Sequence, residues 1–228
     1  MKKFGGPAAI IGLLSFNGGF VDTAGFLGLQ GLFTAHVTGN FVTLGAALVF
    51  GSHGIIGKIL ALPEFILVIA LARLAGSALR RRKAPVLRIL LVTKVALLFL
   101  FFLLAVGCGP FADPDSPAAL LTGFSGIAAM ALQNALQRVH LASSPPTTIM
   151  TGNTTQATID AIDLISGTDP EHAAAIRTRF GRLSLSILYF AAGCAASALL
   201  YWLVGFWSLA LAVLVGAAAA VMRIEAGE

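Results

Sequence analysis

Residues 33–45 read FTAHVTGNFVTLG and residues 146–156 read PTTIMTGNTTQ, two polar stretches in an otherwise apolar chain. The tripeptide Thr-Gly-Asn therefore occurs twice, 113 positions apart (151 minus 38). In each copy the Thr is a favourable helix N-cap and the Gly permits close backbone approach. The recurrence predicts two related halves, each with a helix that starts at its Thr-Gly-Asn motif.

The composition indicates whether the chain folds in water or in lipid. Hydrophobic residues make up 57% of the 228, charged residues 11%, and the mean hydropathy is +0.91. A soluble domain carries about 25% charged residues, so we expect the lipid bilayer to be the main partner. Cys108 and Cys194 allow at most one disulfide and no metal cluster, and no cofactor is expected. The basic residues lie between hydrophobic runs, so nucleic acid is not an expected partner.

Six apolar runs are long enough to cross a bilayer, which takes about 20 helical residues. They cover residues 7–29, 59–79, 86–106, 118–136, 183–204 and 206–222. The first is too long for the apolar core of a signal peptide and contains Asp22, so we interpret it as an uncleaved span. Two shorter helices are predicted after the motifs, at 39–50 and 152–165, with lengths of about 18 and 21 Å. Neither comfortably spans a membrane.

The distribution of basic residues decides whether these short helices cross. If they cross, and Lys2 and Lys3 are cytoplasmic, the basic cluster at 80–83 falls outside. If instead each short helix enters and returns, only Lys58 falls outside, Arg73 and Lys94 lie within spans, and the other Lys and Arg residues are cytoplasmic. The bias favours two re-entrant half-helices and places both termini in the cytoplasm.

Each half then consists of a long helix, a motif, a short helix and two long helices. Three crossings are an odd number, so the second half is inverted relative to the first. The predicted fold is an all-α polytopic membrane protein with six transmembrane helices and two re-entrant half-helices. Residues 1–228 form one transmembrane domain, with repeat 1 at 7–106 and inverted repeat 2 at 118–222. Secondary transporters often use this plan; the alternative is a duplicated bundle with a structural role.

Three stretches carry a family resemblance: GFVDTAGFLGLQGLFTAHVTGN at 19–40, MALQNALQ at 130–137 and PTTIMTGNTT at 146–155. They resemble the YoaK family of bacterial membrane proteins, which carry a domain of unknown function. The similarity covers nearly the whole chain and implies a bacterial inner-membrane protein with a similar number of spans, but it supplies no substrate or mechanism. The two opposed short helices are also similar in plan to nucleobase and sulfate permeases, which are much longer chains.

Helix length places both motif helix starts near the middle of a hydrocarbon core of about 30 Å. Helix starts carry unpaired N–H groups and a partial positive charge, so two facing starts predict an anion site. The predicted solute-binding residues are Asp22, His36, Thr38, Gly39, Asn40, Thr43, Lys94, Gln133, Asn134, Thr151, Gly152, Asn153 and Gln156. Alternatively, Asn40 and Asn153 only tie the broken helices in place.

Other polar residues at membrane depth are functional candidates by default. Asp22 is expected either to line a cavity or to form a buried pair, and Glu64 can approach the same level. Arg73 is expected to extend toward the cytoplasm. On the second short helix one face carries Asn153, Gln156, Asp160 and Asp163. That face is typical either of a wetted pathway or of an interfacial helix end.

The sequence thus predicts a transporter or channel for a small anionic solute, in the bacterial inner membrane, and not an enzyme. A proton- or cation-coupled carrier using Asp22 and a non-transporting scaffold are the alternatives, and a homodimer is left open. Residues 123–126 read Gly-Phe-Ser-Gly, which matches the Gly-x-Ser-Gly of rhomboid intramembrane proteases. Such catalysis needs a histidine partner, and residues 183–222 contain none.

Overall fold

The computed structural model describes residues 7–51, 53–167 and 169–222, and all the regular secondary structure in these ranges is helical. The elements are α1 (Pro7–Gly28), α2 (Gly39–Phe50), α3 (Ile55–Arg81), α4 (Val86–Cys108), α5 (Pro117–His140), α6 (Met150–Ile165), α7 (Pro170–Val204), the 3-10 helix η1 (Gly205–Ser208) and α8 (Leu209–Val221). Lys2, Lys3 and Arg223, which contribute to the predicted orientation, lie outside the described residues.

Five helical segments in the described ranges are long and apolar enough to cross a membrane. They are Ala8–Gly28, Ile55–Arg81, Val86–Cys108, Pro117–His140 and His172–Val221. The last contains α7, η1 and α8, and so covers both of the final two predicted spans, with a break at Gly205 where φ is +58°. The protein is therefore an all-helical membrane protein.

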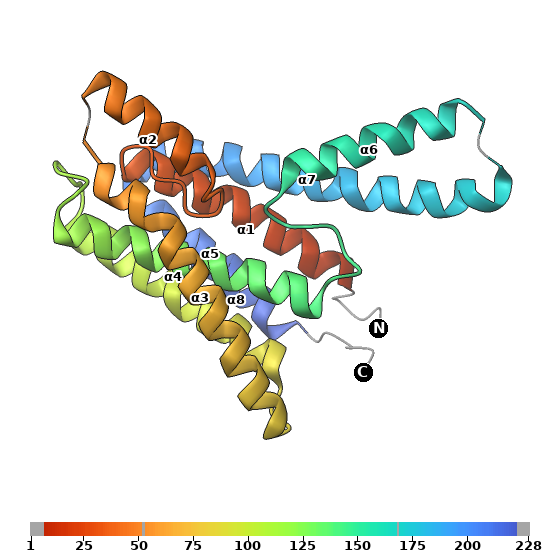
Figure 1. Cartoon of the computed structure of the whole chain (residues 1–228), viewed down its shortest axis with the longest axis horizontal. Helices are drawn as coiled ribbons and strands as arrows, with labels where there is room; N and C mark the ends of the chain where they lie inside the picture. The colour runs from red at the N-terminus through yellow and green to blue at the C-terminus, as the bar shows by residue number, and fades with distance from the viewer. Residues whose placement is uncertain (1–6, 52, 168, 223–228) are drawn as a thin grey trace.

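A short helix is present at each motif. α2 has the predicted bounds, whereas α6 begins at Met150, two residues before the predicted start, and so contains the whole second motif. The larger error concerns α7, which begins at Pro170 and not at 183. Hydropathy could not detect residues 170–182 because they are polar; Pro170 at the first helical position favours a start there. In Figure 1 the α6–α7 hairpin extends far from the other helices.

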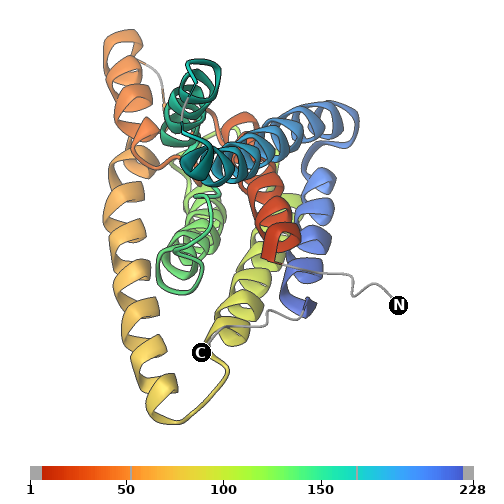
Figure 2. The same ribbon diagram turned by 90° about the vertical axis from the view of Figure 1, so that its right-hand side faces the viewer.

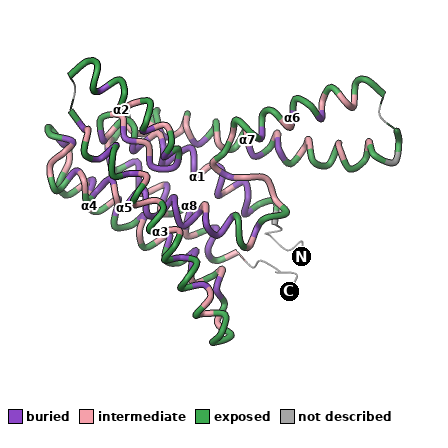
Figure 3. The backbone as a smooth tube through the Cα atoms, in the orientation of Figure 1, coloured by how far each residue is buried: buried purple, intermediate pink, exposed green. Residues whose placement is uncertain are grey.

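A bidentate ion pair joins the two helices of this hairpin. Arg179 donates from Nε and Nη2 to the two carboxylate oxygens of Asp160, at 2.9 and 2.6 Å. Gln156 Nε2 donates to the same carboxylate at 2.8 Å. Asn153, Gln156 and Asp160 therefore lie on one face of α6, as predicted, but that face packs against α7. The opposite face of α6 is exposed, as Figure 3 shows.

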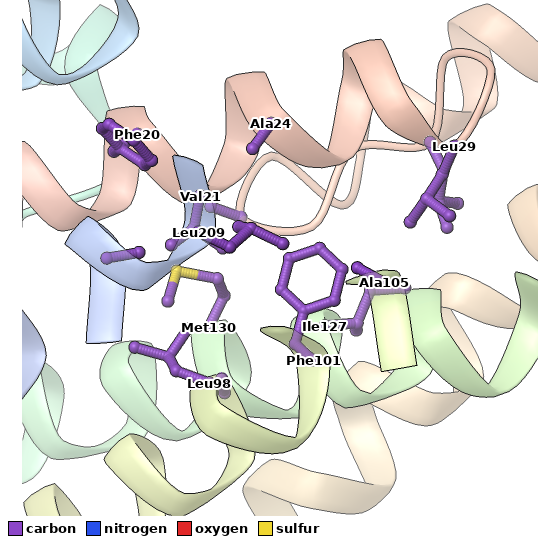
Figure 4. Packing of buried hydrophobic residues seen from close by; sticks show 14 of the residues in the cluster. Phe20, Val21, Ala24, Leu29, Leu98, Phe101, Ala105, Ile127, Met130 and Leu209 are labelled. Carbon is purple, nitrogen blue, oxygen red and sulfur yellow. The ribbon is translucent and has the colours of Figure 1, made fainter. Parts of the chain in front are cut away.

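The core lies around α1 and α5, where the buried part of the backbone is concentrated (Figure 3). Figure 4 shows side chains from α1, α4, α5 and α8 meeting there, with Phe20, Phe101, Ile127 and Met130 fully buried. By contrast, α3 exposes a row of large apolar side chains, including Leu67 and Leu74. Apolar side chains are stable against lipid, so both the core and the lipid-facing surface of the bundle are apolar.

Two similar dipeptides occupy contrasting positions in helix pairs. Ala192-Gly193 in α7 faces α1, where a Cβ on Gly193 would clash with the backbone of Phe16, and one on Gly19 would clash with that of Phe190. These glycines therefore allow α1 and α7 to cross with their backbones in close approach. Gly76, which follows Ala75 in α3, has no atom nearer to its virtual Cβ than Val86 Cγ1 at 3.5 Å. Figure 2 shows the C-terminal half of α3 leading away from the bundle before the chain turns into α4.

Candidate functional site

A cavity of about 630 Å³ lies between α3, α5 and the loops that precede α2 and α6. Two loops reach it: the first motif loop (residues 29–38) with residues 35–38, and the second motif loop (residues 141–149) together with the start of α6, with residues 148–151. Its polar lining residues are His36, Thr38, Arg73, Arg80, Asn134, Arg138, His140, Thr148 and Thr151. Apolar walls come mainly from α3, with Leu90 of α4 and Phe190 of α7. The two motifs thus meet at one cavity, although they are far apart in sequence.

The charge of the lining is entirely basic. Three arginines line the cavity, and none of its lining residues is Asp or Glu. Arg73 and Arg80 of α3 lie near enough to His140 of α5 to act on it electrostatically. Within the described residues, Arg73, Arg80 and Arg138 form no ion pair. The cavity therefore has a positive potential that favours an anion.

The first motif loop is held by Asp22, which does not line the cavity. One carboxylate oxygen, Oδ1, accepts hydrogen bonds from the backbone N–H groups of Thr34, Ala35 and His36 at 2.8, 2.7 and 3.2 Å. Asp22 is buried, so these donors replace the water that a carboxylate otherwise requires. The structure thus places the predicted solute ligand Asp22 behind the loop, where it determines the loop conformation.

Asn40 ties the two ends of this loop together. Its Oδ1 accepts from Phe33 N–H at 2.8 Å and its Nδ2 donates to Phe33 O at 2.9 Å. The hydroxyl of Thr43 donates to Asn40 O at 3.3 Å. Gly39 packs under the same loop, because a Cβ there would lie 3.0 Å from the Phe33 ring. These three predicted ligands support the loop from within and do not line the cavity.

The start of α2 differs from the prediction. Thr38 occupies the N-cap position, but its backbone is αR and its side chain makes no capping bond. The N–H groups of Gly39, Asn40 and Phe41 donate to the carbonyls three residues earlier, at 2.8, 3.1 and 3.2 Å. The prediction that this helix start presents free N–H groups to a solute is therefore wrong. His36 and Thr38 supply side chains to the cavity instead.

The second motif loop repeats the asparagine tie. Asn153 Nδ2 donates to Pro146 O at 2.8 Å, across the same seven-residue separation as Asn40 and Phe33. Pro146 has no N–H, so the reciprocal bond made by Phe33 is impossible here. Thr151 lies inside the first turn of α6, and Ile149 takes the N-cap position. The prediction of Thr151 as an N-cap is wrong because the helix begins at Met150, two residues before the predicted start.

Glutamine side chains of α5 hold this second loop. Gln137 Nε2 donates to the carbonyls of Leu141, Ser144 and Pro145 at 3.0, 3.2 and 3.2 Å. Gln133 Nε2 bridges Leu14 O and Thr147 Oγ1. The neighbouring Asn134 accepts from the Thr148 hydroxyl at 2.7 Å and also lines the cavity.

The start of α6 leaves backbone donors free. Among the described residues, the N–H groups of Met150, Thr151 and Gly152 have no hydrogen-bond acceptor. Met150 and Thr151 line the cavity, and the space around Gly152 is open, with Ile149 Cγ2 3.9 Å from its virtual Cβ. Of the two predicted helix starts, only that of α6 therefore has N–H groups without an acceptor among the described residues, and two of these groups belong to residues that line the cavity.

Two further predicted ligands lie elsewhere. Lys94 is fully buried between α1, α4 and α8, where its Nζ lies 3.4 Å from Asn17 Oδ1, and Asn17 Nδ2 donates to Ala212 O at 2.7 Å. Gln156 donates within α6 to Asp160, the carboxylate that pairs with Arg179 of α7. Ser125 of the Gly-x-Ser-Gly sequence donates its hydroxyl to Thr122 O at 2.7 Å and does not line the cavity.

Sequence reasoning missed Arg80, Arg138, His140 and Thr148 at the cavity. A signal was present, because Arg138 follows Asn134 by one helical turn and Arg80 follows Arg73 by two. Residues three, four or seven apart share a helix face, so Arg138 lies on the same face of α5 as Asn134, and Arg80 lies on the same face of α3 as Arg73. The charge bias by itself assigns Arg80 and Arg138 to one side of the membrane, so it does not predict their place at the cavity.

Comparison with known proteins places the chain in a family. It matches the family described as a protein of unknown function, DUF1275, over residues 10–222, which includes both motif loops and every cavity-lining residue. No curated protein and no solved structure matches it. Because the match covers nearly the whole chain, the protein belongs to the DUF1275 family.

Proposed function

We propose that the protein is a membrane transporter, and not an enzyme, for a small organic anion that binds in the cavity between the two motif loops. The observation that carries this proposal is the lining itself: three arginines, two histidines and the free N–H groups at the start of α6, with no carboxylate. Helix starts and guanidinium groups both favour negative charge. The apolar wall formed by Phe65, Ile69 and Leu90 fits a hydrocarbon body better than it fits a bare inorganic ion.

The proposal includes six crossings, with α2 and α6 re-entrant and the second half inverted. Helix pairing supports the repeat, since α1 packs on α7 and α8 as α5 packs on α3 and α4. The equivalent Asn40 and Asn153 ties support it too. By the positive-inside rule, the bacterial inner membrane would then place both termini and the arginine-lined end of the cavity at the cytoplasm.

Natural and introduced cysteines can test this topology. Cys108 is exposed at the end of α4, so a membrane-impermeant maleimide should label it from the periplasm in a Cys194→Ala background. An Arg82→Cys variant lacking both natural cysteines should be labelled only after the inner face is made accessible. Labelling of Arg82→Cys from the periplasm contradicts the re-entrant α2 and the inversion, and labelling of both positions from the same side contradicts the crossing by α4.

The two ends of the cavity region also differ in a way that supports alternating access. Away from the arginines, Asp115 accepts from the first N–H groups of α3, with distances of 3.0 Å from Gly54 and 3.1 Å from Ile55. Gln30 donates to Phe111 O at 3.0 Å in the same region. The α1–α7 crossing is closed at Gly19 and Gly193. In the opposite state of the carrier, α3 would close on α5 while α7 separates from α1.

Ligand-induced thermal stabilisation of the purified protein tests the solute class. Benzoate should raise the melting temperature, whereas benzamide, benzylamine and sulfate at the same concentration should raise it less. Arg138→Gln should lower the affinity for benzoate about tenfold, because one charge-assisted hydrogen bond is lost. Arg177→Gln, on an exposed part of α7 outside the cavity, is the matched control. Equal stabilisation by benzamide, or equal responses of the two variants, would argue against an anion site.

Uptake by proteoliposomes then separates transport from simple binding. Labelled benzoate should accumulate or exchange in vesicles that contain the wild-type protein, and Arg138→Gln vesicles should show a reduced rate. Binding without any flux would leave a solute-binding membrane protein and remove the transport assignment.

A further inference from the structure

A second groove, of about 670 Å³, lies beside α7 and shares no lining residue with the cavity described above. One wall is the α5–α6 loop at Ser143 and Ser144, and the other is α7 at Thr178, Arg179 and Arg182. Its lining, like that of the cavity, contains no Asp or Glu.

The two arginines of this groove have different roles. Arg179 is held by Asp160 through two hydrogen bonds, so its charge is largely compensated and its side chain is positioned. Arg182 is exposed and has no ion-pair partner among the described residues. Its guanidinium is therefore free to bind an anionic group from outside the chain.

The loop wall is held by hydrogen bonds within the chain. Gln137 donates to the carbonyls of Ser144 and Pro145, which holds the serine-rich segment against the end of α5. A preformed wall lowers the ordering cost of binding, because little conformational freedom remains to be lost. The hydroxyls of Ser143 and Ser144 add hydrogen-bonding capacity beside Arg182.

The groove continues into an apolar stripe on the same face of α7. Thr178, Arg182, Leu185 and Tyr189 follow one another at spacings of four, three and four residues, which places them on one helix face. Leu185 is 52% exposed and Tyr189 46% exposed. Arg182 lies immediately before the apolar segment 183–204. The cationic side chain of Arg182 is therefore followed along the helix by an apolar surface.

We propose that this groove binds an anionic phospholipid, with its phosphate at Arg182 and an acyl chain along Leu185 and Tyr189. The charge at Arg182 selects an anionic headgroup, and the apolar stripe selects a lipid over a soluble phosphate. The inference needs only the membrane location of α7 and does not depend on the solute of the cavity.

Native mass spectrometry of the detergent-solubilised protein tests the site with phosphatidylglycerol and phosphatidylcholine of identical acyl chains. The wild type should retain phosphatidylglycerol preferentially. Arg182→Gln should lower that affinity about fivefold, with an unchanged melting temperature because Arg182 contacts no acidic group. Arg177→Gln, on the same helix but outside the groove, should leave lipid retention unchanged. Equal retention of the two lipids, or equal losses in both variants, overturns the site.

Glycerol phosphate and a chain-contact variant distinguish a lipid from a soluble anion. Glycerol phosphate should not displace phosphatidylglycerol at equal concentration, and Leu185→Ser should weaken retention of the lipid. Displacement by glycerol phosphate, together with full retention in Leu185→Ser, would identify a soluble phosphate site and contradict the lipid assignment.

Discussion

The two motif loops share an asparagine tie but are held by side chains of opposite hydrogen-bonding character. In the first half, the Asp22 carboxylate accepts from three backbone N–H groups. In the second half, the Gln137 amide donates to three backbone carbonyls. Asp22 of α1 accepts because the first loop turns N–H groups toward α1, and Gln137 of α5 donates because the second loop turns carbonyls toward α5. The same asparagine tie therefore occurs in two loops with different backbone conformations.

This difference has an electrostatic consequence for the cavity. The carboxylate of Asp22 opposes the positive potential of the first loop, and the N–H groups that open α2 are paired with carbonyls. The Gln137 amide carries no net charge, and the first N–H groups of α6 are free. The two motif loops therefore show that a motif can have different roles in its two copies. The negative group of a solute is therefore expected beside α6 and Arg138.

The largest effect is expected from removing the first anchor. Asp22→Ala leaves the N–H groups of Thr34, Ala35 and His36 without their acceptor, and the first two are buried. The cost is about 1–3 kcal/mol for each buried group that cannot find another partner. Asp22→Asn keeps an oxygen at the same place and should cost clearly less. Chemical unfolding in detergent measures both. If the two variants are equally unstable, the charge of Asp22 matters more than its hydrogen bonds; if both are fully stable and only transport changes, Asp22 belongs to the site.

The second anchor should respond in the opposite order. Gln137→Ala removes one donor from three carbonyls and should cost about 1–2 kcal/mol. An ionised carboxylate in Gln137→Glu faces those carbonyls with acceptors only, so it should be the more destabilising change. Comparison of unfolding free energies at neutral pH decides the order. A glutamate variant as stable as the wild type would show that the loop is not held by donation from this position.

Smaller and unequal losses are expected from the two asparagine ties. Asn40→Ala removes two short hydrogen bonds to Phe33, about 2 kcal/mol. Asn153→Ala removes one short bond to Pro146 and longer contacts with Ser186 Oγ at 3.5 Å and Met150 Sδ at 3.7 Å, about 1 kcal/mol in all. The double variant should show the sum within about 0.5 kcal/mol, since the two ties share no partner. Strong non-additivity in stability would show that the ties are coupled through the cavity. Non-additivity confined to solute binding would restore the prediction that both side chains touch one ligand.

The smallest effect is expected at the motif glycines. Gly39→Ala places a Cβ 3.0 Å from the Phe33 ring and should cost about 1 kcal/mol through overpacking. Gly152→Ala meets open space in a helix and should stabilise by about 0.5 kcal/mol. Melting temperatures of the two variants should therefore move in opposite directions. Shifts of the same sign would show that the two helix starts are packed alike.

The sequence alone determined the class of molecule and the position of the motifs. Hydropathy located the apolar segments, because transfer of a helix into lipid depends on composition along the chain. The bounds of α2 and the starts of α1 and α4 followed from the same local patterns. The duplication of Thr-Gly-Asn located two loops in which an asparagine bonds to the residue seven positions before it.

The tertiary structure alone decided which polar groups meet. The cavity brings residues 35–38 together with 148–151, and the hydroxyls of Ser15 and Ser186 lie 2.8 Å apart across 171 positions. It also separates Lys94 from that cavity and adds Arg138 to it. In a soluble protein the apolar face of a helix indicates the inside. In a membrane, lipid and core are both apolar, so composition cannot tell which face of a helix lines a cavity, and packing between distant helices must decide it.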